Sequence, residues 1–171
     1  MNTRNRFIVC ALALIGIAYC LVYGYYNLTI YLLGIVGYLA WSQYREGTVF
    51  LATQAFHKQD YEKTKRLLEE IKNPDHLRKG RRNFYEFMRG NIALKEDRIE
   101  DAEVHFQLAS RLPWKRDNEK AMVLINLANI NLRKKEYDRV NAYVEVTEKL
   151  KLTERQKDIL GKIKYEEKKY K

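Results

Sequence analysis

The chain has 171 residues, of which 46% are hydrophobic and 32% are charged, and its formal net charge is +10. These proportions are ordinary for a folded protein of one modest domain with an additional segment. The sequence contains only 2 prolines and 8 glycines, so long irregular loops are not expected.

The charged residues are distributed unevenly along the chain. Residues 7–44 contain no Asp, Glu, Lys or Arg, whereas all 22 acidic residues lie beyond this stretch. Only two of the 32 basic residues, Arg4 and Arg6, precede it. The end of the uncharged stretch therefore predicts a boundary between two regions, 1–44 and 45–171.

The first region contains two apolar segments that are each long enough to cross a membrane as a helix. They cover about residues 7–26 and 28–44, and a membrane-spanning helix needs about 20 apolar residues. Gly24 and Asn27 lie near their junction and are typical of a tight turn. The sequence therefore predicts a transmembrane hairpin in contact with the lipid bilayer. The alternatives are a buried helical hairpin inside a soluble fold and a cleaved signal peptide.

Basic residues around the predicted hairpin indicate its orientation. Arg4 and Arg6 precede the first segment, Arg45 follows the second, and the connection between the segments carries no charge. The positive-inside rule then places both termini and the second region in the cytoplasm. We therefore expect an integral membrane protein of the bacterial inner (plasma) membrane.

The second region consists of units that repeat at a constant interval. Small residues recur at the equally spaced positions Ala52, Gly90 and Ala128, and a polar turn follows each of them. Apolar residues at helical spacing on both sides of each turn predict three pairs of helices. The other sets of residues that recur at this interval are Tyr61, Ile99 and Tyr137; Thr64, Ala102 and Val140; Leu68, Phe106 and Val144; and Ile71, Ala109 and Thr147.

This pattern resembles the tetratricopeptide repeat (TPR) family. The middle unit is the most similar, because Gly90, Ala102, Phe106 and Ala109 stand at the signature positions and Pro113 stands near that of the closing proline. The resemblance implies an all-α fold, an α-solenoid, in which a small residue on the first helix packs against the second helix. The packing residues that it implies are Ala52, Gly90, Ala102, Phe106, Ala109, Ala128 and Tyr137.

The helix interior around Gly90 yields an expectation about substitutions. Glycine is disfavoured there by about 1 kcal/mol relative to alanine, so Gly90→Ala is expected to be tolerated or slightly stabilising. Gly90→Leu is expected to overpack the contact between the two helices of the middle unit.

The units are longer than the family repeat. The expected repeats and the C-terminal capping helix cover about residues 45–78, 83–115, 121–152 and 153–171. The family period is about 34 residues, so each unit has about four more, which we expect in the loops at 75–82 and 114–119. Thr153 and Gln156 form a capping box, which predicts a helix that covers the open end of the stack.

The sequence contains no pattern typical of an enzyme. His57, His76 and His105 are far apart in the sequence, and no metal-ligand pair, phosphate-binding loop or nucleophile elbow is present. Carboxylates on helix faces usually pair with lysine and arginine. We therefore expect no catalytic residues, no metal, no cofactor and no small-molecule substrate.

The resemblance implies that the first helix of each repeat lines a concave groove for a peptide or helix of another protein. Three asparagines with Lys95 and Arg133 partly resemble the family's clamp for a terminal carboxylate. The expected groove residues are Phe87, Asn91, Lys95, Ile125, Asn126, Asn129 and Arg133. The predicted function is a membrane-anchored scaffold or adaptor for protein–protein interactions.

Two other functions stay open. One is a structural subunit of a membrane complex that contacts its partners through the hairpin. The other is a basic tether, for which the expected surface is Arg78, Lys79, Arg81 and Arg82. Such clusters bind anionic lipid or neutralise nucleic-acid phosphates, and the predicted hairpin favours lipid over nucleic acid.

Overall fold

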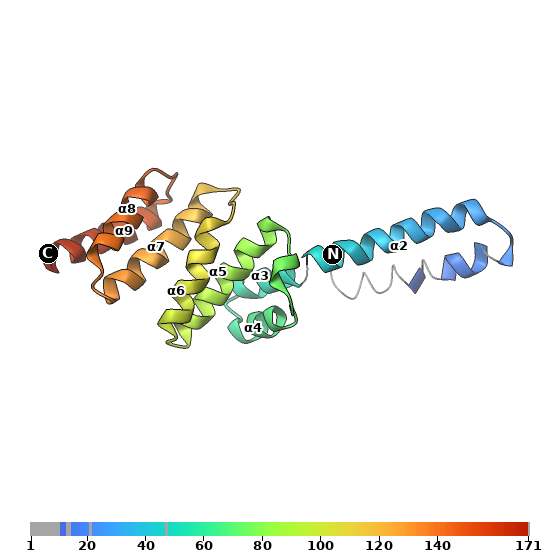
Figure 1. The fold of residues 1–171 in the computed structure, drawn as a ribbon, viewed down its shortest axis with the longest axis horizontal. Coiled ribbons are helices and arrows are strands. Elements are labelled where there is room, and N and C mark those ends of the chain that lie inside the picture. The colour runs from blue at the N-terminus through green and yellow to red at the C-terminus, as the bar shows by residue number, and fades with distance from the viewer. Residues whose placement is uncertain (1–10, 13–14, 21, 47, 171) are drawn as a thin grey trace.

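A computed structural model describes residues 11–12, 15–20, 22–46 and 48–170 of the chain. Over these residues, helices joined by short turns follow one another in chain order and form a helical solenoid (Figure 1). The helices are α2 (Tyr26–Glu46), α3 (Val49–His57), α4 (Tyr61–Glu69), the 3-10 helix η1 (Pro74–His76), α5 (Lys79–Lys95), α6 (Ile99–Arg111), α7 (Asp117–Arg133), α8 (Tyr137–Glu148) and α9 (Glu154–Tyr170). The predicted all-α solenoid class is confirmed.

The helix pairs α3–α4, α5–α6 and α7–α8 share one register. The boundaries on both sides of the turn within a pair recur at the same interval as the small residues Ala52, Gly90 and Ala128. The first helices end at His57, Lys95 and Arg133, and the second helices begin at Tyr61, Ile99 and Tyr137. The period of the sequence is therefore also the period of the helices.

The turn within each pair has the same backbone conformation. One residue in each turn is left-handed, and these residues are Gln59, Asp97 and Lys135, with φ of 60°, 58° and 61°. In the first turn the N–H of Asp60 donates to the carbonyl of Ala55, at 3.0 Å. Arg98 and Glu136 make the corresponding bonds to Ala93 and Asn131, both at 2.9 Å. This closure across six residues is the Schellman motif, which satisfies carbonyls at the end of a helix.

The small residues that recur in the sequence lie in the core of each pair. Ala52, Gly90 and Ala128 are buried, and in the middle pair the ring of Phe106 lies directly over Gly90. A Cβ atom added to Gly90 would be 2.9 Å from Cε1 of Phe106. Of the other predicted packing residues, Ala102, Phe106 and Ala109 have no exposed surface, and Tyr137 is half-buried.

Part of each segment that was expected to be a loop is helical. The helices α5 and α7 contain 17 residues each, and they begin at Lys79 and Asp117, inside the segments expected to be loops. One turn of an α-helix contains about 3.6 residues. In the second and third units, the first turn of α5 and of α7 therefore lies within these segments.

Ion pairs join each repeat to the next at the same register position, with opposite polarity. Lys65 on α4 donates to Glu96 in the next turn at 2.6 Å, whereas Glu103 on α6 accepts from Lys134 in the following turn at 2.5 Å. Lys65 and Glu103 occupy equivalent positions of successive repeats, and so do Glu96 and Lys134. Hydrogen bonds from Lys65 and from Arg98 lower the pKa of Glu96 to about 2. Successive repeats therefore make the same contact, with the acidic and the basic residue exchanged.

The C-terminal helix α9 covers the last repeat. The capping box is confirmed, because the N–H of Thr153 donates to Oε1 of Gln156 at 3.0 Å and the N–H of Gln156 donates to Oγ1 of Thr153 at 3.4 Å. Leu160 and Ile163 are buried in a cluster that includes Ile125 of α7. The helix therefore supplies the apolar surface that a fourth repeat would otherwise provide.

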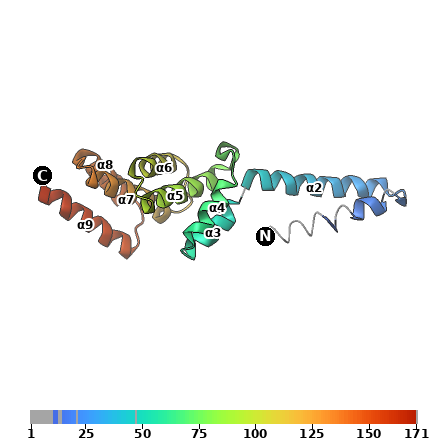
Figure 2. The same ribbon diagram turned by 90° about the horizontal axis from the view of Figure 1, so that it is seen from below.

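The N-terminal region folds back on itself before the chain enters the repeats. Residues 15–20 and 22 are helical, Gly24 has a φ of 74°, and α2 follows. The Cβ position of Gly16 is 3.5 Å from Cδ1 of Leu32, so the two segments lie side by side. The helix α2 extends away from the repeats in both views (Figures 1 and 2). It ends at Glu46, before α3 begins.

The predicted membrane location is contradicted. Among the helices of the described residues, none combines the length and the apolarity that crossing a membrane requires. The helix α2 has 21 residues, but Asn27, Ser42 and Gln43 confine its apolar stretch to residues 28–41, which is shorter than the about 20 residues needed. The prediction of an integral protein of the bacterial inner membrane with cytoplasmic termini is therefore wrong. The predicted transmembrane hairpin has no support in the described residues. The predicted first span, residues 7–26, lies partly outside the described residues.

Candidate functional site

One side of the first helices carries polar and basic residues in the repeat register. Asn91 and Asn129 occupy the same position on α5 and α7, and Lys95 and Arg133 occupy the same position one turn later. On α3 the corresponding residues are polar as well. We call the six residues the polar face: Thr53, His57, Asn91, Lys95, Asn129 and Arg133. All of them are half-buried or exposed.

Two predicted groove residues lie inside the solenoid. Phe87 is half-buried, and its ring centroid is 5.9 Å from that of Phe56, 6.0 Å from that of Phe106 and 6.3 Å from that of Trp114. Ile125, which is 3% exposed, packs beneath α9. Both side chains therefore hold neighbouring units together, and the buried Ile125 offers no apolar surface to a ligand, in contrast to the prediction.

The three predicted groove asparagines differ in their surroundings. Nδ2 of Asn91 donates to the carbonyl of Phe87 at 2.8 Å, which fixes the amide and leaves its second hydrogen and its oxygen for other partners. Asn129 is half-buried. Nδ2 of Asn126 is buried and has no hydrogen-bond partner among the described residues. Asn91 and Asn129 are therefore the two amides that share a position on the polar face.

The cations of the polar face lie at the C-terminal ends of their helices. Nζ of Lys95 is 3.7 Å from the centroid of the Tyr61 ring, which is the geometry of a cation–π contact. A cavity of about 410 Å³ opens beside it, and Lys65 and Glu96 also line this cavity. Arg133 is exposed at the corresponding position of α7. The C-terminal end of a helix favours positive charge.

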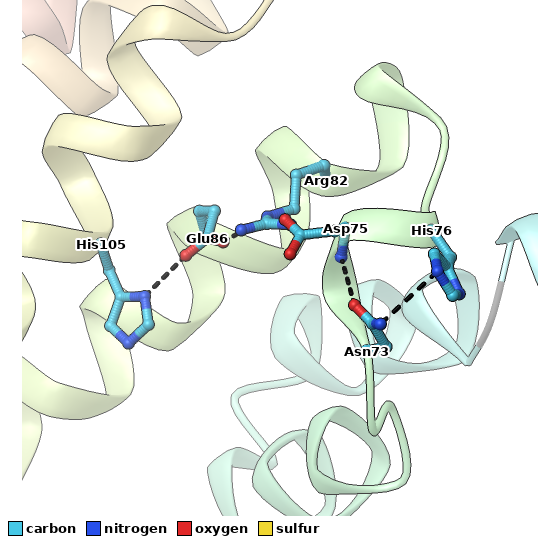
Figure 3. A network of polar contacts seen from close by, with 6 residues as sticks. All are labelled: Asn73, Asp75, His76, Arg82, Glu86 and His105. Carbon is cyan, nitrogen blue, oxygen red and sulfur yellow. Dashed lines mark hydrogen bonds and ion pairs between the residues drawn. The ribbon is translucent and has the colours of Figure 1, made fainter.

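A buried carboxylate links the two helices of the second repeat. Glu86 on α5 is 1% exposed; its Oε1 accepts a hydrogen bond from Nε of Arg82, and its Oε2 is 2.6 Å from Nδ1 of His105 on α6 (Figure 3). Nη1 of Arg82 also donates to Oδ1 of Asp75 at 2.6 Å. Because an ionised carboxylate only accepts hydrogen bonds, the bond assigns the proton of a neutral His105 to Nδ1.

This network joins the two helices of the second repeat, so its role is structural. Both oxygens of Glu86 are occupied, one by Arg82 of its own helix and the other by His105 of the neighbouring helix. Arg82 was predicted as part of a basic surface, but its side chain is only 18% exposed. The repeat register contains a signal for the network, since Glu86 stands where α7 has the buried Leu124. A carboxylate at a position that is otherwise apolar requires a buried partner.

The other predicted basic residues gather at the opposite end of the long helices. Arg78, Lys79 and Arg81 stand at the start of α5. Arg78 and Arg81 line a cavity of about 440 Å³ together with Lys115 and Arg116, which precede α7. The structure thus brings two basic segments of the sequence to one place, whereas only the first was predicted.

No group of three or more His, Cys, Asp or Glu side chains within the described ranges is arranged to hold a metal ion. Comparisons with protein families, with curated proteins and with solved structures found no match for this chain.

Proposed function

We propose that this chain is a helical-repeat adaptor that binds an extended, acidic segment of another protein along its polar face. The observation that carries the proposal is the repetition of an amide followed by a cation one turn later. Asn91 with Lys95 on α5 has the same register as Asn129 with Arg133 on α7. The resemblance to tetratricopeptide repeats belongs to this proposal, because it implies a protein ligand along the first helices.

The chemistry of the polar face supports a peptide with negative charge. An amide carries donors and an acceptor, so it bonds a peptide backbone whatever the side chains of the peptide are. Lys95 and Arg133 add positive charge for acidic side chains or for a free C-terminal carboxylate. Recognition is polar in this proposal, because Phe87 and Ile125 already pack inside the solenoid.

Asn91→Ala combined with Asn129→Ala is expected to weaken binding of acidic peptides about tenfold or more. Each amide–backbone hydrogen bond contributes about 0.5–1.5 kcal/mol, and about 1.4 kcal/mol corresponds to a factor of ten. The measurement is the Kd of the full chain for synthetic peptides with acidic C-terminal sequences, with the terminus either free or amidated. The tightest peptides of the parent are then compared with the double variant.

Gln54→Ala serves as the control for this comparison. Gln54 is an exposed amide on α3 that does not belong to the polar face, so its loss is expected to leave the Kd unchanged. Thermal unfolding of all variants checks that the fold is intact. The proposal is wrong if no acidic peptide binds, or if the double variant binds these peptides as tightly as the parent does.

A second candidate function is a structural subunit that contacts its neighbours through α2. Leu28, Ile30, Leu33 and Ile35 are each 50–68% exposed on this helix, and an exposed apolar surface of this kind marks an interaction site. Gly34 has no atom within 4 Å of its Cβ position, which leaves room for another helix to approach closely. We propose that the contacting partner is the helix α2 of a second copy of this chain, because that helix offers the same apolar surface.

Leu33→Gln combined with Ile35→Gln is expected to convert such an assembly to monomers of 20.4 kDa, since polar side chains remove the apolar contact. The measurement is the molar mass of the full chain by light scattering after gel filtration. Val104→Gln, which changes an exposed apolar residue on α6, is the control and is expected to leave the mass unchanged. A parent chain that is monomeric contradicts this candidate.

A further inference from the structure

The N-terminal ends of α5 and α7 and the loops before them enclose a cavity of about 440 Å³. We call it the basic cavity. The second repeat contributes Arg78, Gly80, Arg81 and Phe84, and the segment before the third repeat contributes Lys115 and Arg116. It lies at the opposite end of α5 and α7 from Lys95 and Arg133 of the polar face.

Positive charge dominates the lining of the basic cavity. Four of the lining residues are cations, and Glu119 is the one carboxylate among them. Oε1 of Glu119 is 2.7 Å from Nη2 of Arg116, so this carboxylate is paired with one of the four cations. The guanidinium of Arg81 lies 5.8 Å from the centroid of the Phe50 ring, within the range of a cation–π contact. Like charges concentrated in one concave site attract an anion.

An arginine immediately precedes each of the two helices that begin at this cavity. Arg78 and Arg116 are the residues that precede α5 and α7, they occupy equivalent positions of successive repeats, and neither side chain makes a capping bond to its helix. Gly80, in the first turn of α5, has no atom within 4 Å of its Cβ position, so its backbone is accessible from the cavity. Backbone N–H groups of a first helical turn carry partial positive charge and add to that of the side chains.

One hydrogen bond and one ring contact join the two segments in the wall of the basic cavity, and two local hydrogen bonds orient the side chains involved. Asn83, which is 2% exposed, donates from Nδ2 to the carbonyl of Pro113 at 2.7 Å, and its Oδ1 accepts from the N–H of Phe84 at 2.7 Å. The ring of Phe84 lies 5.2 Å from that of Trp114, whose Nε1 donates to the carbonyl of Ala109 at 2.9 Å. A site that is ordered in advance loses less conformational entropy when a ligand binds.

We propose that the basic cavity binds the phosphate group of a phosphorylated side chain on a partner protein. A phosphate monoester carries about two negative charges near neutral pH, and the planar guanidinium of arginine matches its oxygens in pairs. The cavity volume lies within the range of about 300–1,000 Å³ that is usual for small ligands, and the phosphate together with the first atoms of its side chain fits such a space. This proposal rests on the proposed function in one respect, because both take the ligand to be part of another protein.

A single phosphate suits this cavity better than a polynucleotide does. Single-stranded nucleic acid is bound along a groove of positive charge with several stacking rings. Here one aromatic ring, Phe84, lines the cavity, and the cations come from two short segments, 78–81 and 115–116. RNA binding is therefore a result that would overturn the proposal.

The test uses the full chain and a nine-residue peptide of Gly and Ala with one central phosphoserine. Trp114, which packs on Phe84 in the wall, serves as a local reporter through its indole N–H signal in NMR spectra. We expect the phosphopeptide to shift this signal in a saturable manner, while the unphosphorylated peptide leaves it unchanged. Affinity is expected to fall as the pH drops below about 6, because the phosphate then loses its second charge.

Lys115→Gln combined with Arg116→Gln is expected to weaken phosphopeptide binding at least about tenfold, because charge-assisted hydrogen bonds are lost. Neither side chain is buried, so folding is expected to persist, and circular dichroism checks it. Lys162→Gln combined with Lys168→Gln removes the same charge from exposed positions of α9 and is expected to leave the affinity unchanged. Equal weakening in both double variants would reveal a net-charge effect and overturn the proposal.

Three further results would also overturn it. Inorganic phosphate that binds as tightly as the phosphopeptide would make the ligand a free phosphate. A 12-nucleotide RNA that binds more tightly than the phosphopeptide, with a steep dependence on salt, would make it a nucleic acid. A phosphopeptide that does not shift the Trp114 signal would place the site elsewhere.

The variant with Asn91→Ala and Asn129→Ala is expected to bind the phosphopeptide as the parent does. The proposal for the basic cavity and the proposal for the polar face can therefore fail independently.

Discussion

Replacing Arg82 by methionine is expected to lower the free energy of unfolding by about 3–5 kcal/mol. The substitution keeps much of the apolar stem of the side chain but removes the guanidinium, which donates to Oε1 of Glu86. Glu86 is 1% exposed, so its carboxylate would remain in the core with His105 as its neighbour. The cost of an unpaired buried charge exceeds the net contribution of the ion pair itself. The measurement is equilibrium unfolding in guanidinium chloride, followed by circular dichroism.

Two comparisons isolate the buried carboxylate as the cause. Arg82→Met combined with Glu86→Leu removes both charges and gives α5 the leucine that α7 has at this register position, so most of the stability is expected to return. Arg98→Met removes an arginine that pairs with Glu96 and Asp101 on the surface, and little change is expected, because solvent screens exposed ion pairs. A single Arg82→Met variant that unfolds at the same denaturant concentration as the parent would mean that Glu86 does not need this partner.

Gly90→Ala is expected to destabilise the chain by about 1–3 kcal/mol, contrary to the expectation from helix propensity. The added Cβ atom would be 2.9 Å from Cε1 and from Cζ of Phe106, and Phe106 has no exposed surface into which its ring can move. Helix propensity favours alanine by about 1 kcal/mol, which is too small to offset this contact. Gly90→Leu adds three more carbon atoms at the same place and is expected to cost more. Denaturant midpoints of the two variants and the parent provide the measurement.

A glycine elsewhere in the chain separates propensity from packing. Gly161 lies inside α9, is exposed and has no atom within 4 Å of its Cβ position, so Gly161→Ala is expected to stabilise by up to about 1 kcal/mol. In the Gly90→Ala background, Phe106→Leu removes the ring atoms that meet the new Cβ. The two substitutions together are therefore expected to cost less than the sum of their separate costs. Strict additivity would show that Gly90 and Phe106 are not in contact.

Much of the repeat architecture was determined by the sequence alone. The equally spaced sets of residues predicted where the small residues, the turns and the second helices lie, and the capping box of Thr153 and Gln156 predicted the start of the last helix. Such features depend on residues within about one helical turn of one another. The same local pattern occurs in all three repeats, which makes it easy to recognise in the sequence. The starts of α5 and α7 inside the segments expected to be loops were missed, because a longer helix and a longer loop give the same sequence period.

Contacts between distant segments decided the rest. Phe87 and Ile125 occupy the helix side that the sequence pattern assigned to a groove, but Trp114 and α9 pack against them from residues much later in the chain. Asn83 binds Pro113, 30 residues away, and thereby joins two basic segments into one cavity. The period of a helix determines which residues share a side, whereas the neighbour that covers that side is determined by packing across the whole chain. The sequence therefore determined the repeat, and the tertiary structure decided which of its surfaces are left to bind a partner.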